Sequence, residues 1–449
     1  MPLHPVMSPI MKAWVNLRSV NITNPTTTAD YFASQWVDPS DIFSVLLLLG
    51  PEIVQQAVAQ LAGRAITPVA FSFGWVAYSA KALLSMIGDG RLMPETDMLN
   101  TLVIGADSKH VRTASSWILG RLLRDLDDRY DKEMEGEESH VPPSQSVSAR
   151  PGFTEKEKGI SHQQGKPWEA LRISVYQVIN QDGHNHGVPH CDWVWYSGFV
   201  VILGQLVIAM LPWVLYGQWG TFLITAYGNF LALLSGSLPQ WRKEKWSCPR
   251  NGGATVTLTQ GNGSRHAVVI LGEKKAGLDL EILARGTRTS APSRVTRLAA
   301  ALLAIQWIGL LITADGLAID TWYLLGIGAL GSIQNVIAAG ARRSPSALGV
   351  HIRDIGQPIR GNRVADVLKA AERQYPGLGM SLVPIFFPGS MRVQPSEFDF
   401  WRAANERQMG PNRFGTRIDN LPPPPQSSTI QMAADVPEHD LINTEEKHI

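Results

Sequence analysis

Charge is missing from one long stretch of this chain. Asp, Glu, Lys and Arg make up 18% of the sequence, yet none of them, and no His, lies between Trp193 and Trp241. A helix needs about 20 apolar residues to cross a hydrocarbon layer about 30 Å thick, so this stretch has room for two helices. Turn residues at 217–220 predict membrane spans at 194–216 and 221–238, with aromatic rings near their ends. The alternative, a helical hairpin inside a soluble protein, requires both helices to be buried on every side.

Cysteine is scarce. The chain has two cysteines, Cys191 and Cys248, which cannot build a disulfide framework. Both flank hydrophobic segments on the side of the membrane that the charge pattern below assigns to the cytosol. We therefore expect two free thiols.

Catalytic and targeting motifs are also missing. The sequence contains no His-Glu-x-x-His, no Gly-x-Ser-x-Gly and no Walker loop, so we expect neither an enzyme nor a bound cofactor. The formal net charge is +1 and no basic stripe with interleaved aromatics occurs, so nucleic acid is not an expected partner. The N-terminus lacks a basic region followed by an apolar core, which argues against a cleavable signal peptide and leaves targeting to the internal spans.

Two further apolar regions flank the central one and complete the predicted fold. The first comprises a weaker span at 42–61, which contains Glu52, and a span at 66–87 with Lys81 near its end. The second comprises spans at about 298–314 and 322–341. The expected fold is an α-helical polytopic membrane protein with about six spans in three hairpins and a small cytosolic α+β module built from two loops. The expected order is a polar segment (1–41), a first hairpin (42–87), a cytosolic loop (88–193), a second hairpin (194–238), a β-rich cytosolic loop (239–297), a third hairpin (298–341) and a largely disordered cytosolic tail (342–449).

The two loops contain complementary pieces of a sheet. Period-two or β-rich runs predict strands at 99–104, 171–178, 254–259 and 267–271, with a further candidate at 278–283, and an amphipathic helix is expected at 115–130. A lone hairpin is marginal in water, so we expect one shared sheet under the membrane. Its core face is expected to carry the apolar residues Val103, Ile173, Val175, Val256, Val268 and Ile270. Of the neighbours Val269 and Ile270, one should then point inward and the other outward. The segment 131–166, rich in Glu, Lys, Ser, Pro and Gly, predicts disorder. The tail predicts short helices at 365–374 and 396–408.

Basic residues predict the orientation in the membrane. They follow the fourth span, precede the fifth and follow the sixth, as Arg242, Lys243, Arg294, Arg297, Arg342 and Arg343. The positive-inside rule places these ends, both large loops and both termini in the cytosol. Small residues spaced four apart, such as Gly228 with Ala232 and Gly328 with Ser332, predict close helix–helix packing, unless they reflect only the abundance of Gly and Ala in spans.

Two groups of polar residues are candidate sites. His184, His186, His190 and Cys191 have side chains that could hold Zn²⁺ or Cu⁺, although a turn that happens to carry histidines is the commoner case. Glu52 and Lys81 could form an intramembrane polar site for an ion or solute, or belong to a helix that lies partly in the interface. The turn at 261–264 leads from strand to strand and is expected to be a plain hairpin turn.

Several segments resemble uncharacterised multi-pass membrane proteins predicted from filamentous fungal genomes. They are the uncharged hairpin with its bounding Trp residues, Leu238–Trp246, Leu258–Gly272, Gly277–Glu281, and the runs 66–75 and 116–125. The resemblance implies the architecture alone. We expect an interaction or regulatory scaffold in the lipid bilayer that contacts proteins through its cytosolic module and tail. The alternative is a transporter or channel that uses the polar residues of the first hairpin.

Overall fold

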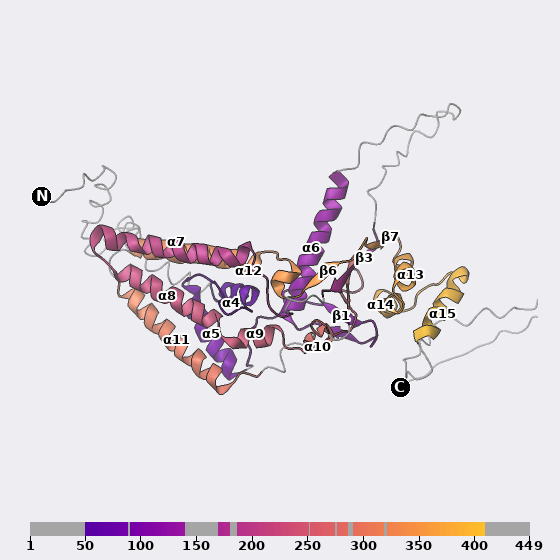
Figure 1. Cartoon of the computed structure of the whole chain (residues 1–449), viewed down its shortest axis with the longest axis horizontal. Coiled ribbons are helices and arrows are strands. Elements are labelled where there is room, and N and C mark those ends of the chain that lie inside the picture. Colours follow the sequence, from indigo (N-terminus) through magenta and orange to yellow (C-terminus); the bar gives the residue numbers. More distant parts are fainter. Residues whose placement is uncertain are drawn as a thin grey trace, which may run out of the picture. The chain divides into compact units, whose positions relative to one another are not determined.

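The computed structural model describes residues 50–88, 90–139, 169–179, 186–250, 252–273, 276–285, 291–317 and 321–408 of the chain (Figure 1). The chain divides into two compact units, residues 1–388 and 389–449. The first unit contains the long apolar helices and the sheet. The second contains η3 (Pro395–Glu397) and α15 (Phe398–Gln408), close to the helix expected at 396–408.

Four helices in the described part of the chain are long and apolar enough to cross a membrane. They are α7 (Trp193–Tyr216), α8 (Gly220–Gly236) with its continuation α9 (Pro239–Lys245), α11 (Arg294–Asp315) and α12 (Thr321–Gly340). The uncharged stretch thus forms the two helices expected of it, joined at Gly217, whose φ of 74° favours glycine. Large apolar side chains point outward from these helices; Val200 on α7, for example, is 68% exposed. This outer surface suits contact with lipid.

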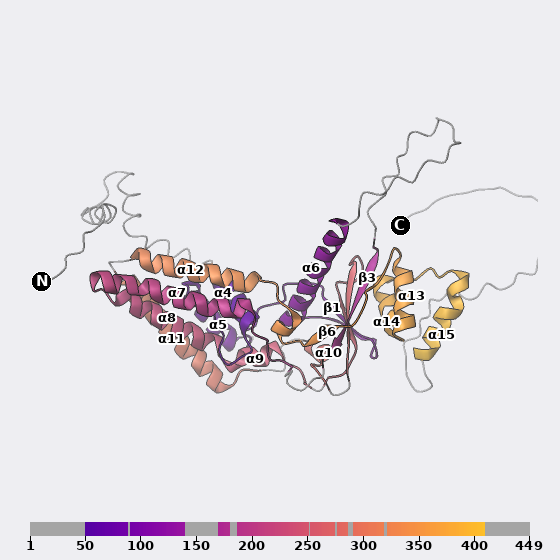
Figure 2. The same ribbon diagram turned by 45° about the horizontal axis from the view of Figure 1, so that its top comes forward.

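The first predicted hairpin is not confirmed. Residues 42–49 lie outside the described part, and the helices that follow, α4 (Pro51–Leu61) and α5 (Gly74–Ile87), are each shorter than a membrane span. A continuous helix over 66–87 is not present, because 62–73 lies outside the helices and α5 begins only at Gly74. Contacts place α4 beside α12 and α5 beside α11, and Figures 1 and 2 show α4 among the long helices.

Residues 62–73, which we call the inner segment, enter the helix bundle and return to the same end of it. At the entrance, the Ala62 carbonyl accepts from Lys245 at the end of α9, and after α5 the chain reaches Gly90 beside Pro292, just before α11. Between these points, the Phe71 carbonyl accepts a 2.8 Å hydrogen bond from Gln205. Gln205 lies about 18 Å along α7 from Trp193, at a rise of about 1.5 Å per residue. The inner segment therefore reaches the middle of the bundle without crossing it.

Amide side chains on the long helices satisfy the backbone of the inner segment. The Ala70 N–H donates to Gln334 Oε1 (3.1 Å) and the Phe71 N–H donates to Asn229 Oδ1 (3.0 Å). The side chains of Gln205, Asn229 and Gln334 are at most 3% exposed. Irregular backbone inside a membrane protein is tolerated where protein groups replace the missing hydrogen bonds. These amides explain why a sequence expected to be a helix can be irregular here.

Small residues of the long helices also face the inner segment. A Cβ added at Gly228 would lie 2.7 Å from the Phe71 ring, and one at Gly328 would lie 2.4 Å from the Phe73 ring. The glycines were expected to bring helices together. In the structure they make room for aromatic side chains of the inner segment instead.

The sheet draws its strands from three parts of the chain that the long helices separate. Its order is β2-β1-β4-β5-β3-β6, with β7 also paired to β3, and only β3–β5 is parallel. The strands are β1 (Leu102–Gly105), β2 (Val111–Thr113), β3 (Leu171–Val178), β4 (Val256–Thr259), β5 (His266–Leu271), β6 (Ile352–Asp354) and β7 (Ile359–Gly361). Pairing of β1 with β4 and of β3 with β5 confirms that the two loops share one sheet. The strand expected at 278–283 is wrong, because this segment forms the short helix α10 (Leu280–Leu283).

Both faces of the sheet are buried. Helix α6 (Trp117–Ser139) packs against β5 on the face that carries Val268 and Ile270. Helices α13 (Val364–Gln374) and α14 (Leu378–Phe386) pack against β3 and β1, and Figure 2 shows them across the sheet from α6. Val269 and Ile270 are therefore at most 1% exposed, and the expectation that one of them points to solvent is wrong.

The β3–β5 register shows how side chains are divided between the two faces. Ser174 pairs with Val268 and Ile173 with Ala267, so Ser174 shares the face that α6 covers. Ile173 and Val175 lie on the opposite face, not on the one expected for them. Strand β3 is apolar at nearly every position, so its sequence did not reveal which side faces α6.

Two segments expected to lack structure are folded. Helix α6 continues through Ser139 instead of stopping near 130, while the rest of the 131–166 prediction lies outside the described part. The start of the tail forms η2 (Pro345–Leu348), β6, β7, α13 and α14, of which only α13 was expected in this unit. The structure thus makes 342–388 part of the module.

Candidate functional site

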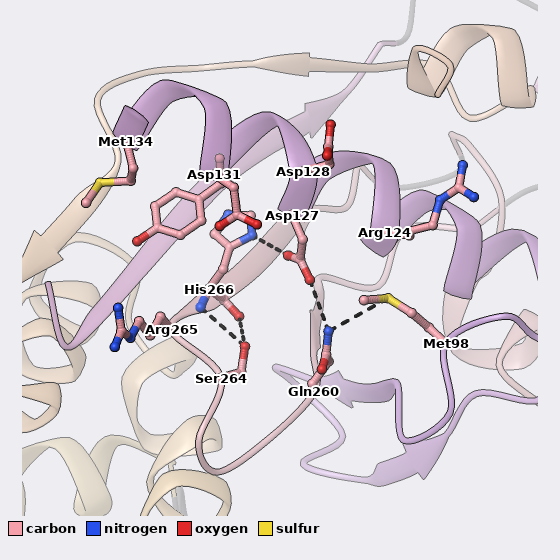
Figure 3. A pocket seen from close by; sticks show the side chains of 11 residues that line it. Met98, Arg124, Asp127, Asp128, Asp131, Met134, Gln260, Ser264, Arg265 and His266 are labelled. Atoms are coloured by element: carbon pink, nitrogen blue, oxygen red, sulfur yellow. Dashed lines mark hydrogen bonds and ion pairs between the residues drawn. The ribbon is translucent and has the colours of Figure 1, made fainter. Parts of the chain in front are cut away.

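A cavity of about 570 Å³ lies between α6 and the β4–β5 turn, and we call it the module pocket (Figure 3). Its lining residues are Met98, Arg124, Asp127, Asp128, Tyr130, Asp131, Met134, Gln260, Ser264, Arg265 and His266. Most come from one face of α6 or from the turn that leads into β5. Ionisable groups of both signs and two Met side chains line the same cavity, so its lining is more polar than that of most small-molecule sites and suits a polar ligand.

His266 at the start of β5 has a partner at each of its two ring nitrogens. Its Nδ1 lies 2.6 Å from Asp127 Oδ1, and its Nε2 lies 2.9 Å from Ser174 Oγ on the neighbouring strand. Tyr130 stacks on the imidazole with ring centroids 4.9 Å apart. Since a carboxylate can only accept, the neutral imidazole in this arrangement has its proton on Nδ1 toward Asp127, and its Nε2 accepts from the serine hydroxyl. His266 is 4% exposed, so its tautomer and orientation are fixed by these neighbours.

A second, smaller cavity lies on the Ser174 side of His266. It has a volume of about 60 Å³ and is lined by Arg172, Ser174, His266 and residues around them on α6 and β6. The Arg172 guanidinium packs over the Tyr130 ring at 5.1 Å and bonds Glu133 Oε2 through Nη2 at 3.0 Å. Its Nε and Nη1 are buried and have no hydrogen-bond partner in the described part of the chain. Two donors of a cation are therefore available on this side.

Helix α6 connects the module pocket to the end of α12. Arg124 lines the pocket, and its Nη2 donates to the Ala341 carbonyl at 3.4 Å. Asp128 lines it as well and pairs with Arg342. Between them, Asp125 Oδ2 accepts from the Arg343 backbone N–H at 3.1 Å. Burial raises the pKa of Asp125, while that backbone hydrogen bond and the charge of Arg124 oppose the increase.

Arg343 extends this connection to two further helices. Its guanidinium binds Asp192, the N-cap of α7, through two hydrogen bonds of 2.7 and 2.8 Å. Its Nη1 also donates to the Gln60 carbonyl, which accepts a second bond from Lys245. The side chains of Arg343 and Lys245 thus both donate at the C-terminal end of α4, where the last carbonyl groups of a helix lack partners within the helix. Arg343 and Lys245 are buried, so the ends of α4, α7, α9 and α12 meet at one polar junction.

The residues of the expected metal site are not brought into one cluster in the described part of the chain. His184 lies outside it, His186 bonds the Ile179 carbonyl, and the His190 backbone N–H donates to the Ser346 carbonyl. No group of three or more His, Cys, Asp or Glu side chains suited to a metal ion occurs among the described residues. Cys191 and Cys248 are both free, as expected.

The structure does bring Glu52 and Lys81 together. Lys81 Nζ lies 3.0 Å from Glu52 Oε1, with the two side chains 40% and 65% exposed. They therefore lie on the surface of the unit and are not enclosed between helices.

The polar residues of the module pocket were missed in the sequence. Asp127 fell within the amphipathic helix expected at 115–130 and Ser174 within the strand expected at 171–178, whereas His266 lay just before the strand expected at 267–271; none of the three was a candidate site residue. The available signal was spacing: His266, Val268 and Ile270 alternate on one face of a strand, so a helix covering Val268 must also reach His266.

Comparisons with protein families, curated proteins and solved structures found no match to this chain. The resemblance to fungal membrane proteins therefore stays a prediction, and function must be argued from geometry.

Proposed function

We propose that this chain is an integral membrane protein whose cytosolic module binds a small polar ligand and thereby regulates the helix bundle. The observation that carries the proposal is the dual role of Arg124 and Asp128. Both line the module pocket, and both also hold residues 341–343 at the end of α12. A ligand that engages either side chain competes with its contact to α12, so binding and the position of the helix end are linked.

The junction at Arg343 supplies the route from α12 to the other helices. Arg343 contacts the ends of α4 and α7, and α4 leads into the inner segment. A movement of residues 341–343 therefore acts, through α4, on the inner segment, whose backbone is bonded by side-chain amides of the long helices. Such a regulatory scaffold agrees with the function expected from the sequence.

Coupling can be tested without knowing the ligand by filling the pocket covalently. In a background with both cysteines replaced, Gln260→Cys in the full-length protein in nanodiscs is modified with pyrene maleimide, and hydrogen exchange of the Arg343 amide is measured. We expect faster exchange after modification, because the Asp125–Arg343 hydrogen bond weakens. Asp107→Cys, on the exposed β1–β2 turn, is the matched control and should leave exchange unchanged. Equal exchange in modified and unmodified Gln260→Cys protein would remove the basis of the proposal.

The orientation is part of the proposal. Arg242, Lys243, Arg294, Arg297 and Arg342 are exposed near the ends of the long helices, at the end that meets the module, and the positive-inside rule assigns that end to the cytosol. A C-terminal tag should then be protected from external protease in intact cells. Glycosylation of Asn21 would contradict the cytosolic N-terminus.

The alternative of a transporter or channel has weaker support. Its candidate residues, Glu52 and Lys81, form a surface pair, whereas the middle of the bundle is occupied by Phe71 and Phe73, which are at most 2% exposed. Solute flux into proteoliposomes that is lost in Glu52→Gln would favour this alternative over the regulatory role.

A further inference from the structure

Ser174, His266 and Asp127 form a hydrogen-bonded chain with the connectivity of an activated nucleophile. Ser174 Oγ lies 2.9 Å from His266 Nε2, and Asp127 Oδ1 lies 2.6 Å from His266 Nδ1. In this order the imidazole can take the hydroxyl proton, while the carboxylate holds the ring and stabilises the imidazolium that forms. The three residues come from β3, β5 and α6, and the strand register and helix packing hold them together.

The small cavity beside Ser174 supplies the other two requirements, space and an oxyanion donor. Arg172, two residues before Ser174 and on the same face of β3, lines the cavity and is 5% exposed, with two N–H-bearing atoms that have no partner among the described residues. A buried cation with free donors stabilises charge that develops nearby. The cavity volume of about 60 Å³ equals that of about two water molecules, so it admits only a short acyl group.

We propose that the module is also an esterase-type site that transfers a short acyl group from a carboxylic ester to water through Ser174. Ser174 Oγ bonds to the carbonyl carbon as its proton passes to His266 Nε2, and the oxygen that becomes negative lies toward Arg172. The bond from carbon to the alcohol oxygen then breaks, and the alcohol leaves with the proton from Nε2. Water attacks the acyl-serine in the same way, gives a proton to His266, and releases the carboxylic acid as Ser174 recovers its hydrogen.

The positively and negatively charged side chains around the small cavity are equal in number. Arg129 and Arg172 face Glu133 and Asp354 around it. A neutral ester therefore suits the site better than a strongly charged substrate.

The test uses the full-length protein in nanodiscs with p-nitrophenyl acetate. We expect a burst of nitrophenolate of about one equivalent per protein, and an acetyl group on Ser174 in peptide mass spectrometry. Locating the acetyl group is essential, because surface His and Lys side chains also react with this ester. Ser174→Ala should abolish the burst, and Ser108→Ala, a serine on the exposed β1–β2 turn, should leave it unchanged.

Two more variants separate catalysis from a purely structural hydrogen-bonded chain. Asp127→Asn should slow acetylation of Ser174 by on the order of 10³- to 10⁴-fold, because the ring loses its required tautomer. Arg172→Met should slow it by about 10²- to 10³-fold through loss of the oxyanion donor. Thermal unfolding and size exclusion show whether each variant is folded. Folded wild-type protein that gives no burst, or a burst that survives in Ser174→Ala, overturns the proposal. Neither result bears on the Arg343 exchange experiment, so the regulatory proposal stands or falls separately.

Discussion

Gly331 on α12 provides the sharpest test of the inner segment. A Cβ at this position would lie 1.8 Å from the Phe71 carbonyl oxygen and 2.7 Å from Gln205 Nε2, and real Cβ contacts essentially never fall below 3.0 Å. In Gly331→Ala the Phe71 carbonyl must therefore retreat by about 1.2 Å. The obstacle is backbone, which cannot swing aside as the end of a long side chain can.

The cost can be worked out from its parts. Overpacking of this kind costs about 1–3 kcal/mol, and we expect the upper end because backbone must move. Loss of the hydrogen bond from Gln205 to the Phe71 carbonyl adds about 1 kcal/mol. Alanine regains about 1 kcal/mol over glycine in a helix. The net destabilisation is about 3 kcal/mol, which corresponds to a fall in Tm of about 4 °C at about 1.2 °C per kcal/mol for a unit of this size.

The assay is thermal unfolding followed by size exclusion in a mild detergent. Gly326→Ala is the matched control, since Gly326 lies on the same helix and an added Cβ meets nothing within 4 Å. It should leave Tm unchanged or raise it slightly. Gly198→Ala, whose Cβ would lie 1.8 Å from the Pro68 carbonyl oxygen, should behave like Gly331→Ala. Equal Tm values for the Gly331 and Gly326 variants would refute the placement of the inner segment.

Three further predictions concern the junction, a thiol and the sheet. Arg343→Met leaves Asp192 without its partner and should cost about 3–5 kcal/mol in detergent unfolding. Burial, with a smaller contribution from a nearby carboxylate, raises the pKa of Cys248 to about 12, so at pH 8 it should react with iodoacetamide about 2,000-fold more slowly than a free cysteine. This thiol ionises near pH 8.5 in the unfolded chain but only near pH 12 in the folded one. Its contribution to the free energy of unfolding is therefore lost as pH rises from about 8.5 to about 12. Val269→Asp and Ile270→Asp should both lower the yield of folded protein sharply, since each buries an unpaired charge.

Controls exist for each of these predictions. Arg342→Met, at a side chain that is 55% exposed, should cost less than about 1 kcal/mol. The same Cys248 in protein unfolded by SDS should react at the ordinary rate. An exposed strand position such as Val111, 46% exposed on β2, should accept Asp with little loss of folded protein. Equal effects at the paired positions would contradict the burial on which the predictions rest.

The sequence predicted those parts of the fold that depend on local pattern. The uncharged run at 193–241 predicted α7 and α8 because a helix in lipid must be apolar on its outer surface. Strand patterns likewise found β1, β3, β4 and β5. The three-residue strands β6 and β7 are too short to show a period, and 278–283 has an apolar spacing that suits a strand as well as a helical turn.

The inner segment and the candidate site depend on partners far away in the chain. Residues 62–73 can stay irregular because Gln205, Asn229 and Gln334 bond their backbone, and those partners lie 130 or more residues away. A buried amide within an apolar span was a usable signal, because such a side chain needs a partner. The chain from Asp127 through His266 to Ser174 had only the alternation of His266 with Val268 and Ile270 as a signal, because α7 and α8 separate His266 from the other two residues in the sequence.

The three-part origin of the sheet has a consequence for biosynthesis. Strand β3 leaves the ribosome well before its partners, because they come much later in the sequence. Arg172 pairs with His266, and Tyr176 pairs with Asp354. At about 5–20 residues per second, β3 waits about 5–20 s for β5 while α7 and α8 enter the membrane, and longer for β6. During that time its unpaired edges can template association with other chains. Assembly of this protein should therefore depend on how fast the long apolar helices are inserted and on chaperones that bind nascent strands. No contiguous fragment of the chain contains the whole module without the helices that interrupt it.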